Sequence, residues 1–330
     1  MGPLVSLLSS AFRLSLLGTA FSLLNLVPAG RFGAFFELNN NLATYYLGGH
    51  LCVVLLVPVF AYAKVLRVRT ALIYGGLSLF LAWLYLSPMV RFLEPSWKDR
   101  RYISEEKNST KIRVLFANVE LGNESAADNV LALEQTYKPD IIGLVEVTPW
   151  LMKHLPFRER YASVYELPRN DHFGLAFYST LPVGDAPIIT LGEGLSAVYI
   201  NTVYVSHTPI EFILYHPPPP VDGDFWMENR LLSRRLATHL RHTGGNTLVA
   251  GDFNATPHSR NYELIVHGGG MHNAMEGYGW NRTWNMHSPI IRLPIDHVLF
   301  RGEIEVVNWQ ALEPIGSDHL PLLVDFRVGN

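Results

Sequence analysis

Long apolar segments dominate the first part of the chain. They cover residues 14–29, 45–63 and 70–90, and each is close to the length that a helix needs to cross a bilayer core of about 30 Å. A cleavable signal peptide is the competing interpretation of the first segment, but no convincing cleavage site follows it before the two further segments. The pattern therefore predicts a membrane region over residues 1–92 with about three helices, or with two if the first segment is not a span.

Beyond a charged stretch at residues 93–111, which we interpret as a linker, the apolar runs become short. Such runs are typical of buried strands, and the apolar spacing of two other stretches indicates amphipathic helices. The predicted strands cover residues 112–120, 141–147, 173–179, 197–205, 211–216, 246–254, 293–300 and 321–328, and the predicted helices cover residues 127–138 and 224–240. This mixture predicts an α/β or α+β domain over residues 112–330, built around two sheets.

Composition and charge sharpen this division. The chain is 48% hydrophobic with a mean hydropathy of +0.14, and its apolar excess lies before residue 90. Residues 97–330 carry 20 Lys and Arg residues against 27 Asp and Glu residues, a net charge of −7. Proteins that bind long nucleic acids non-specifically usually present a basic face, so this balance disfavours a processive nuclease. Cys52 is the only cysteine, so no intramolecular disulfide is possible.

Carboxylate, amide and imidazole side chains recur where apolar runs end. These residues are Asn118, Glu146, His216, Asp252, Asn254, Asp296, Asp318 and His319. Each of them alone is compatible with an ordinary polar turn. Ligands of α/β sheets bind at the carboxyl ends of the strands, so the recurrence predicts one shared cleft.

The same positions carry a resemblance to a known family. The motifs are NVE at 118–120, PDIIGLVEV at 139–147, the strand end at His216, GDFNATP at 251–257, IDHVLF at 295–300 and SDHLPL at 317–322. In this order they resemble the endonuclease/exonuclease/phosphatase superfamily, which includes pancreatic deoxyribonuclease, inositol polyphosphate 5-phosphatases and neutral sphingomyelinases. The resemblance implies a four-layer sandwich of two packed mixed β-sheets flanked by helices. It also implies hydrolysis of a phosphodiester with a divalent cation, usually Mg²⁺, with Mn²⁺ as a substitute.

The resemblance also implies a set of metal ligands. They are Glu146 as the main ligand, Asn118 and Asp318 beside it, and Glu120 near the metal. Oxygen ligands suit magnesium, and the lack of a cluster of cysteines and histidines disfavours zinc.

The remaining motif residues are expected to carry catalysis. By resemblance, His319 is the general base that activates water, and Asp296 orients its ring. An imidazole suits this task because its ordinary pKa lies near neutrality. Asp252 and Asn254 are expected to contact the nucleophile and the phosphate, with the division of labour for Asp252 left open. His216 is expected to donate a hydrogen bond to a phosphate oxygen, where developing charge needs stabilisation.

Two positions depart from the family pattern. Relatives often have a glutamate that orients the first catalytic histidine, where this chain has Asp171 and His172, and His297 stands where an aromatic residue is frequent. Trp280 and Trp284 fall in a stretch that often lines the substrate wall. Such a tryptophan could stack on a base or a sugar, meet a lipid headgroup, or simply pack in a loop.

The basic residues near the apolar segments bear on orientation. Lys64, Arg67 and Arg69 lie in the short loop before the third segment, and short basic loops prefer the cytoplasm. Basic residues also follow the third segment, but large domains translocate largely regardless of charge. Asn254 begins an Asn-X-Thr sequence whose glycosylation would block the cleft, which favours a bacterial source. We therefore expect an integral protein of the cytoplasmic membrane with its catalytic domain on the periplasmic or extracellular side.

The expected function is that of a membrane-anchored, metal-dependent phosphodiesterase. Its substrate is a nucleic acid or a phospholipid, as in a nuclease or a neutral sphingomyelinase, and its other partner is the lipid bilayer. A non-catalytic binding module is disfavoured because all the motif residues are present. A transporter is disfavoured because the second and third segments contain essentially no charged residues.

Overall fold

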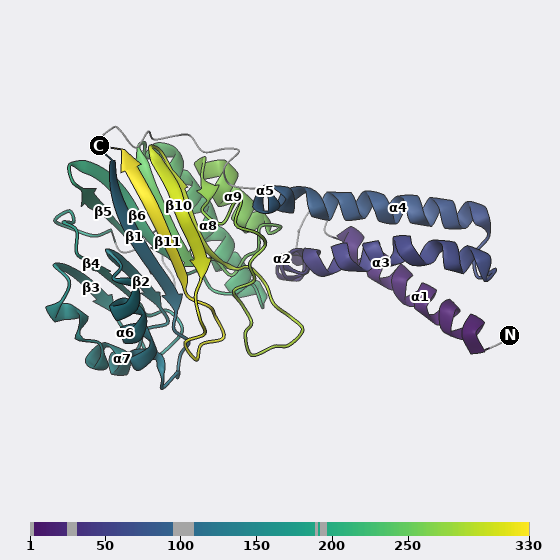
Figure 1. The fold of residues 1–330 in the computed structure, drawn as a ribbon, viewed down its shortest axis with the longest axis horizontal. Coiled ribbons are helices and arrows are strands. Elements are labelled where there is room, and N and C mark those ends of the chain that lie inside the picture. Colours follow the sequence, from purple (N-terminus) through teal and green to yellow (C-terminus); the bar gives the residue numbers. More distant parts are fainter. Residues whose placement is uncertain (1–2, 25–31, 95–108, 189–190, 192–196, 330) are drawn as a thin grey trace.

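The computed structural model describes residues 3–24, 32–94, 109–188, 191 and 197–329 (Figure 1). A group of long N-terminal helices projects from a sandwich of two β-sheets. The helices before the sandwich are α1 (Pro3–Leu23), α2 (Gly33–Asn41), α3 (Ala43–Tyr62), α4 (Val68–Leu86) and α5 (Val90–Leu93), with a short 3₁₀ turn (Ser87–Met89) between the last two.

Three of these helical stretches are long and apolar enough to cross a membrane, namely Val5–Leu23, Ala43–Tyr62 and Val68–Leu93. The second and third agree with the predicted segments. The first helix begins earlier than predicted and ends at Leu23, and residues 25–29 of the predicted segment lie outside the described residues. Most of the predicted linker, residues 95–108, also lies outside them.

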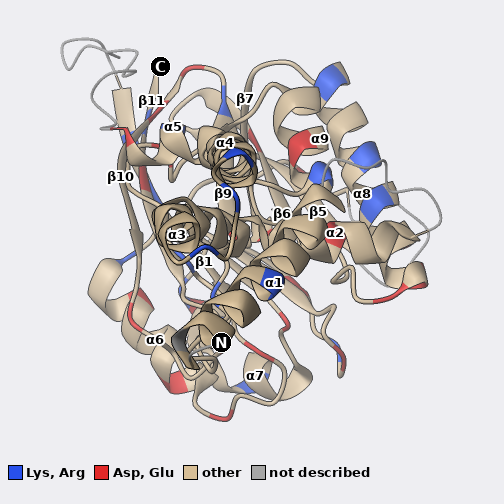
Figure 2. Ribbon diagram, turned by 90° about the vertical axis from the view of Figure 1, so that its right-hand side faces the viewer, with Lys and Arg blue, Asp and Glu red and all other residues tan. Residues whose placement is uncertain are grey.

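The long helices α1, α3 and α4, which we call the arm, are apolar on nearly every side. Val53 and Val57 of α3 pack against Ala71 and Tyr74 of α4, while leucines such as Leu55 point outward. Figure 2 shows most of the charged residues on the sandwich rather than on the arm. Helices that are hydrophobic all round are typical of a buried or membrane environment.

Helix α2 was not predicted, because its polarity is inverted. Its residues Glu37 and Asn39 to Asn41 are buried, whereas Phe35 and Leu38 are exposed. Its first residue, Gly33, lies so close to Trp226 that a Cβ atom would come within 2.0 Å of the indole ring. The polar face of α2 therefore packs on the sandwich, beside helix α8 (Gly223–His242).

The sandwich consists of a six-stranded and a five-stranded sheet. The first has the order β10-β11-β1-β2-β4-β3 and the second the order β5-β6-β7-β9-β8. The strands are β1 (Ser109–Asn118), β2 (Ile141–Val145), β3 (Ser163–Leu167), β4 (Leu175–Ser179), β5 (Val198–Val205), β6 (Thr208–Tyr215), β7 (Asn246–Asp252), β8 (His272–Asn273), β9 (Asp296–Arg301), β10 (Ile304–Ala311) and β11 (Leu322–Gly329). Strands β1 and β2 are parallel, as are β6 and β7, and the other pairs are antiparallel.

Helices cover the outer faces of both sheets. Helices α6 (Ala126–Tyr137) and α7 (Pro149–His154) pack on the first sheet, and α8 and α9 (Arg260–Gly269) pack on the second. Residues such as Phe116, Phe177 and Phe212 fill the space between the sheets. The predicted four-layer sandwich with a preceding helical region is confirmed.

Several elements of the sandwich were not predicted from the sequence, namely β3, α7, α9, β10 and the two-residue strand β8. Strand β10 is an edge strand with a bulge between Val306 and Asn308. Strand β3 is the opposite edge of the same sheet, with an intermediate to exposed burial pattern. Edge strands need less apolar alternation than central ones, so their signal is weak. Helix α9 follows GDFNATP directly and was overlooked behind that motif.

Candidate active site

The polar strand ends meet at one edge of the sandwich. Because β1 is parallel to β2 and β6 is parallel to β7, the carboxyl ends of each pair lie together. Strand β9 runs antiparallel to β7 and begins at this edge, where Asp296 stands directly opposite Asp252. The segment that leads into β11 brings His319 to the same place.

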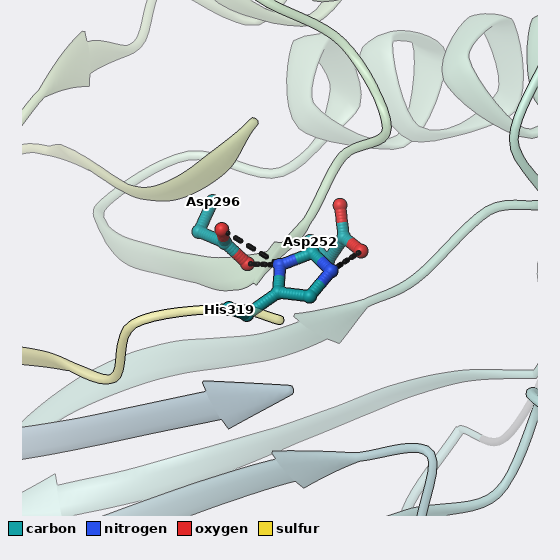
Figure 3. Close-up of side chains that lie close together, drawn as sticks. All are labelled: Asp252, Asp296 and His319. Carbon is teal, nitrogen blue, oxygen red and sulfur yellow. Dashed lines mark hydrogen bonds and ion pairs between the residues drawn. The ribbon is translucent and has the colours of Figure 1, made fainter. Parts of the chain in front are cut away.

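His319 and Asp296 form the closest pair in this cleft (Figure 3). The Nδ1 atom of His319 lies 2.9 and 3.0 Å from the two carboxylate oxygens of Asp296, and both side chains are buried. A carboxylate accepts here from Nδ1–H, which fixes the tautomer and leaves Nε2 as the reactive nitrogen. Nε2 points toward Asp252, 3.6 Å from its Oδ2 atom.

Neighbouring charges govern the protonation of His319. Burial lowers the pKa of the imidazole, but the carboxylates of Asp296 and Asp252 outweigh it and raise the pKa to about 10. The Oδ1 atom of Asp318 also lies 3.6 Å from Nε2. With this pKa and with the neighbouring carboxylates ionised, the ring of His319 is an imidazolium, so the cleft contains a positive charge.

Asp252 lies between two imidazoles. Its Oδ2 atom is 3.6 Å from Nε2 of His216 and 3.6 Å from Nε2 of His319. Burial raises the pKa of Asp252, and His319 opposes this shift. Burial lowers the pKa of His216 to about 4, so His216 is neutral near pH 7. The cleft therefore contains one carboxylate with a raised pKa between a neutral and a charged imidazole.

Glu146 lies on the other side of the cleft, just after β2. Its carboxylate accepts hydrogen bonds from Asn118 Nδ2 at 3.0 Å, from Leu121 N at 2.9 Å and from His172 Nδ1 at 2.7 Å. Burial alone would raise the pKa of Glu146, but His216 and these hydrogen bonds more than offset it and hold the pKa below its ordinary value. Glu146 is therefore an ionised carboxylate in a mostly buried setting.

Asn118 connects the two sides. Its Nδ2 atom donates to Glu146 and also lies 3.2 Å from Oδ2 of Asp252, so one amide bridges carboxylates from both sheets. Its Oδ1 atom accepts from Glu120 N. The carboxylate of Glu120 accepts in turn from Asp318 N at 3.0 Å, and Asp318 accepts from the indole nitrogen of Trp284 at 2.6 Å. Asn118, Glu120, Glu146 and Asp318 thus form one hydrogen-bonded network.

Two groups of side chains in the cleft could hold a divalent cation. The first consists of Asp252, Asp296 and His319, whose ligand atoms all lie within 4.8 Å of one another. One ring nitrogen is already bonded to Asp296 there, so this group is better explained as a proton-transfer unit. The second consists of Asn118, Glu120, Glu146 and Asp318. It offers only oxygen donors, including a carboxylate that stays ionised, which is the donor set that magnesium prefers. The second group therefore has the chemistry of the predicted cation ligands, although among the described residues its carboxylates do not come as close together as the ligand atoms of the first group.

The backbone around the site shows why these residue types follow the strands. Glu120, Glu146 and Asn254 have φ values of 60°, 63° and 50°, in the left-handed region. Such conformations cost about 1–3 kcal/mol and cluster at functional sites. Gly251 precedes Asp252, and a Cβ atom there would lie 1.8 Å from the carbonyl oxygen of Tyr215. The glycine of GDFN is therefore required by the close approach of β6 and β7.

Several predicted site residues have other contacts. The amide of Asn254 donates to Pro217 O at 3.0 Å, so it holds the ends of β6 and β7 together. Asp171 pairs with Arg169 and His172 contacts Glu146, so neither is hydrogen-bonded to His216. Of the alternatives that the sequence left open for Asp171 and His172, these contacts favour the one in which neither orients His216.

Trp280 and Trp284 lie in different surroundings. Trp284 lies in the cleft, with its ring 6.4 Å from that of His319. Trp280 instead packs against Phe92 of α5 and against His258, which favours packing in a loop over lining of the substrate wall. The alternative interpretation from the sequence, that this tryptophan simply packs in a loop, agrees with these contacts. His297 is also a packing residue, bonded to Ala255 O.

One residue with a positioning role was not singled out in the sequence. Ser317 donates to Asn118 O at 2.8 Å and accepts from His319 N at 3.0 Å. It ties His319, the candidate general base, to the strand that carries the candidate metal ligand Asn118. Its place directly before Asp318 and His319 in SDHLPL was the available signal.

Comparisons with known proteins agree with this architecture. Residues 115–319 match the sequence profile described as the Endonuclease/Exonuclease/phosphatase family. No protein with a curated description matches the chain.

Similar folds occur among solved structures. TDP2 of D. rerio in complex with a single-strand DNA product is 16% identical, with a TM-score of 0.54 over 66% of this chain and 99% of that one. The catalytic domain of human Nocturnin with a bound sulfate anion is 18% identical, with a TM-score of 0.54 over 71% and 98%. An endonuclease/exonuclease/phosphatase protein of Beutenbergia cavernae is 18% identical, with a TM-score of 0.53 over 67% and 72%. At these identities the likeness is one of fold.

Proposed function

Because the chain belongs to the endonuclease/exonuclease/phosphatase family, we propose that it is a membrane-anchored, divalent-metal-dependent phosphodiesterase. One observation carries the proposal: the buried Asp296–His319 pair faces Asp252, within the same cleft as an all-oxygen group of candidate metal ligands. This combination provides a proton acceptor and a cation site beside one another. Both functions accelerate the hydrolysis of a phosphoester.

His319 and Asp252 are the candidates for accepting the proton of the attacking water. Asp296 orients the imidazole of His319 and stabilises it once it is charged. Asp252 has a raised pKa and lies 3.6 Å from the same nitrogen, so the protonation of each group depends on the charge of the other. His216 is neutral and buried beside them, which suits it to donate a hydrogen bond to a phosphate oxygen.

The residues that would hold the cation are Glu146, Asn118, Asp318 and Glu120. A bound Mg²⁺ would polarise the phosphate and neutralise its developing charge. Its positive charge would also lower the pKa of His319, which favours the neutral ring. Trp284 keeps Asp318 in place through its indole N–H, which makes it a positioning residue for this ligand as well as part of the wall of the cleft.

The N-terminal helices provide the anchor in this proposal. The membrane region is residues 1–92, the linker is residues 93–111 and the catalytic domain is residues 112–330. The loop between α3 and α4 carries Lys64 and Arg67 and would lie in the cytoplasm, which places the catalytic domain on the outer face. Replacing Cys52 with Ser and His207 with Cys creates a single thiol on the sandwich. We expect a membrane-impermeant thiol reagent to label it in intact cells.

Activity is tested with the full-length protein in detergent micelles. We expect turnover of bis(p-nitrophenyl) phosphate with Mg²⁺ or Mn²⁺, and loss of turnover with a chelator. His319→Ala should lower kcat by about 10²- to 10⁴-fold, the range for a general base. His207→Ala is the matched control, because His207 is exposed in the turn between β5 and β6, at the end of β6 opposite the cleft. Metal-independent turnover, or full activity of His319→Ala, would contradict the proposal.

A nuclease is the competing function. TDP2 of D. rerio, which shares the fold, was solved with a single-strand DNA product. The net charge of −7 over residues 97–330 opposes binding of a long polyanion. Single-stranded DNA, duplex DNA and RNA belong in the same assay, and efficient turnover of any of them would favour the nuclease.

A further inference from the structure

The polar face of α2 is bonded to the loop that follows the catalytic strand β7. Asn41 accepts from Thr256 N at 2.8 Å and donates to Asn254 O at 3.4 Å, within the GDFNATP motif. Glu37 accepts from the hydroxyl of Ser259 and from Asn261 N. The catalytic loop is therefore held directly by the helix that leads into the arm.

A second loop of the cleft is bonded to the arm itself. Tyr45, on the first turn of α3, donates to the carbonyl oxygen of Ile290 at 2.8 Å and accepts from Arg292 N at 2.7 Å. At the other end of this loop, Trp284 pairs with Leu293 and with the backbone at His319. The loop of residues 284–293 thus runs from the catalytic histidine to the point where the apolar helix begins.

Apolar side chains are exposed where these loops meet the arm. Ile290 is 74% exposed and Ile291 is 46% exposed at the loop tip, while Phe35 and Leu38 are 45% and 39% exposed on the outer side of α2. We call these four residues the apolar rim. A helix with polar residues buried and apolar residues outward is unfavourable in water, so the rim needs an apolar surface to cover it.

We infer that the apolar rim rests in the surface of the bilayer and that the cleft takes the phosphodiester headgroup of a lipid in the same leaflet. This inference rests on the proposed function and names its substrate class. Tyr45 is the third residue of the apolar stretch Ala43–Tyr62, so the loop tip lies at the depth where that stretch would enter the membrane. The continuity of the rim with the anchor is the reason to assign a bilayer, rather than a protein, as its occupant.

The depth of the cleft agrees with this assignment. A bilayer has a headgroup layer of roughly 5–8 Å on each side of its hydrocarbon core. The loop residues Asn254 and Thr256, which are bonded to α2, follow Asp252 of the cleft by only two and four positions. A rim at the hydrocarbon boundary therefore places the cleft among lipid phosphates. A long polyanion such as a nucleic acid would instead have to approach an acidic domain next to a membrane.

The first test compares lipid and soluble substrates in one sample. Full-length protein is placed in vesicles of phosphatidylcholine, phosphatidylethanolamine, phosphatidylglycerol and sphingomyelin with Mg²⁺, and released headgroups are measured by mass spectrometry. Turnover of bis(p-nitrophenyl) phosphate is measured in parallel. We expect hydrolysis of at least one lipid. For the double variant Ile290→Asp and Ile291→Asp, we expect the ratio of lipid to soluble turnover to fall by about tenfold or more, because both side chains lose apolar contact.

The matched control is Val164→Asp. Val164 is 38% exposed on the edge strand β3, outside the apolar rim, and its substitution should leave the ratio unchanged. A wild-type protein that hydrolyses the soluble diester but none of the lipids would overturn the inference and leave the proposed function standing. An unchanged ratio in the double variant would overturn it too. A wild-type protein without turnover of any substrate would contradict the proposed function instead.

The second test measures whether the apolar rim contacts the bilayer, and it does not depend on catalytic activity. Cys52→Ser removes the only thiol, and Ile290→Cys provides one for an environment-sensitive fluorophore. In phosphatidylcholine and phosphatidylglycerol vesicles we expect a blue-shifted emission that spin-labelled lipids quench. The same label at Val164→Cys should keep the emission of a water-exposed dye. A label at residue 290 that behaves like the label at residue 164 would overturn the inference.

Discussion

The cleft and the junction, by which we mean the contact of α2 with the sandwich, both bury carboxylates, but they do so in opposite ways. In the cleft, Asp252 and Asp296 face the charged imidazole of His319. At the junction, Glu37 is 1% exposed and its hydrogen-bond donors are the hydroxyl of Ser259 and the backbone N–H of Asn261. The cleft sets carboxylates against a charged imidazole, and the junction bonds a carboxyl group to a hydroxyl and a backbone N–H, with Arg230 and Arg260 acting on it only through their charge.

This difference separates two purposes of burying a polar group. Charges held close together in a dry cleft can exchange protons and respond to a cation, which is useful chemically and costly for stability. Burial raises the pKa of Glu37, despite the hydrogen bonds, so the junction favours the neutral acid. A carboxyl group held in this way serves attachment. Substitutions at the two sites should accordingly separate activity from stability.

The largest expected effect is on catalysis. Asp296→Asn keeps the size of the side chain but removes the negative charge that orients His319 and stabilises its charged form. We expect kcat for bis(p-nitrophenyl) phosphate to fall by about 10²-fold or more, with a much smaller change in KM. Asp185→Asn, at an exposed position, is the control and should keep full activity. A kcat within a factor of about two of the wild type would remove Asp296 from the catalytic unit.

The cation should stabilise the protein through the cleft and not through the junction. At a Mg²⁺ concentration of about 100 times its Kd, binding to the folded state contributes about 2.7 kcal/mol. We expect thermal unfolding in detergent to shift upward with Mg²⁺ in the wild type and in Glu37→Gln. The shift should disappear in Glu146→Gln, which lacks the charged ligand. A Glu146→Gln protein that still responds to Mg²⁺ would place the cation elsewhere.

The sequence predicted the cleft much better than the junction, and the reason is physical. Hydrolytic chemistry restricts the identity of His319, Asp252 and Glu146, and the short motifs that hold them follow strands with clear apolar patterns. No such restriction acts on α2, where Glu37 and Asn41 look like solvent-facing residues because their partners, the hydroxyl of Ser259 and several backbone groups, lie far away in the chain. Trp280 shows the converse, since it sits in a family-like stretch but packs against Phe92.

The next effect is one of stability at the junction. Glu37→Ala leaves the hydroxyl of Ser259 and the N–H of Asn261 buried without their acceptor. We expect the free energy of unfolding to fall by about 1–3 kcal/mol, with kcat on the soluble diester little changed. Glu124→Ala, at an exposed position before α6, is the control. If Glu37→Ala instead lost activity as Asp296→Asn does, the junction would belong to the catalytic machinery and the comparison would fail.

The smallest effect is a pH dependence confined to the junction. The folded state raises the pKa of Glu37 above its ordinary value of 4.5, mainly through burial. Its favourable contribution is therefore fully present below the ordinary pKa and is lost as the pH rises through the folded pKa. Glu37→Gln imitates the neutral acid at every pH, so the wild type should lose stability relative to Glu37→Gln as the pH rises above the ordinary value of 4.5. Asp252, whose pKa is also raised, is common to both proteins and cancels in the difference. Parallel stability curves for the two proteins across this range would show that Glu37 keeps an ordinary pKa and that the junction, like the cleft, holds a charge.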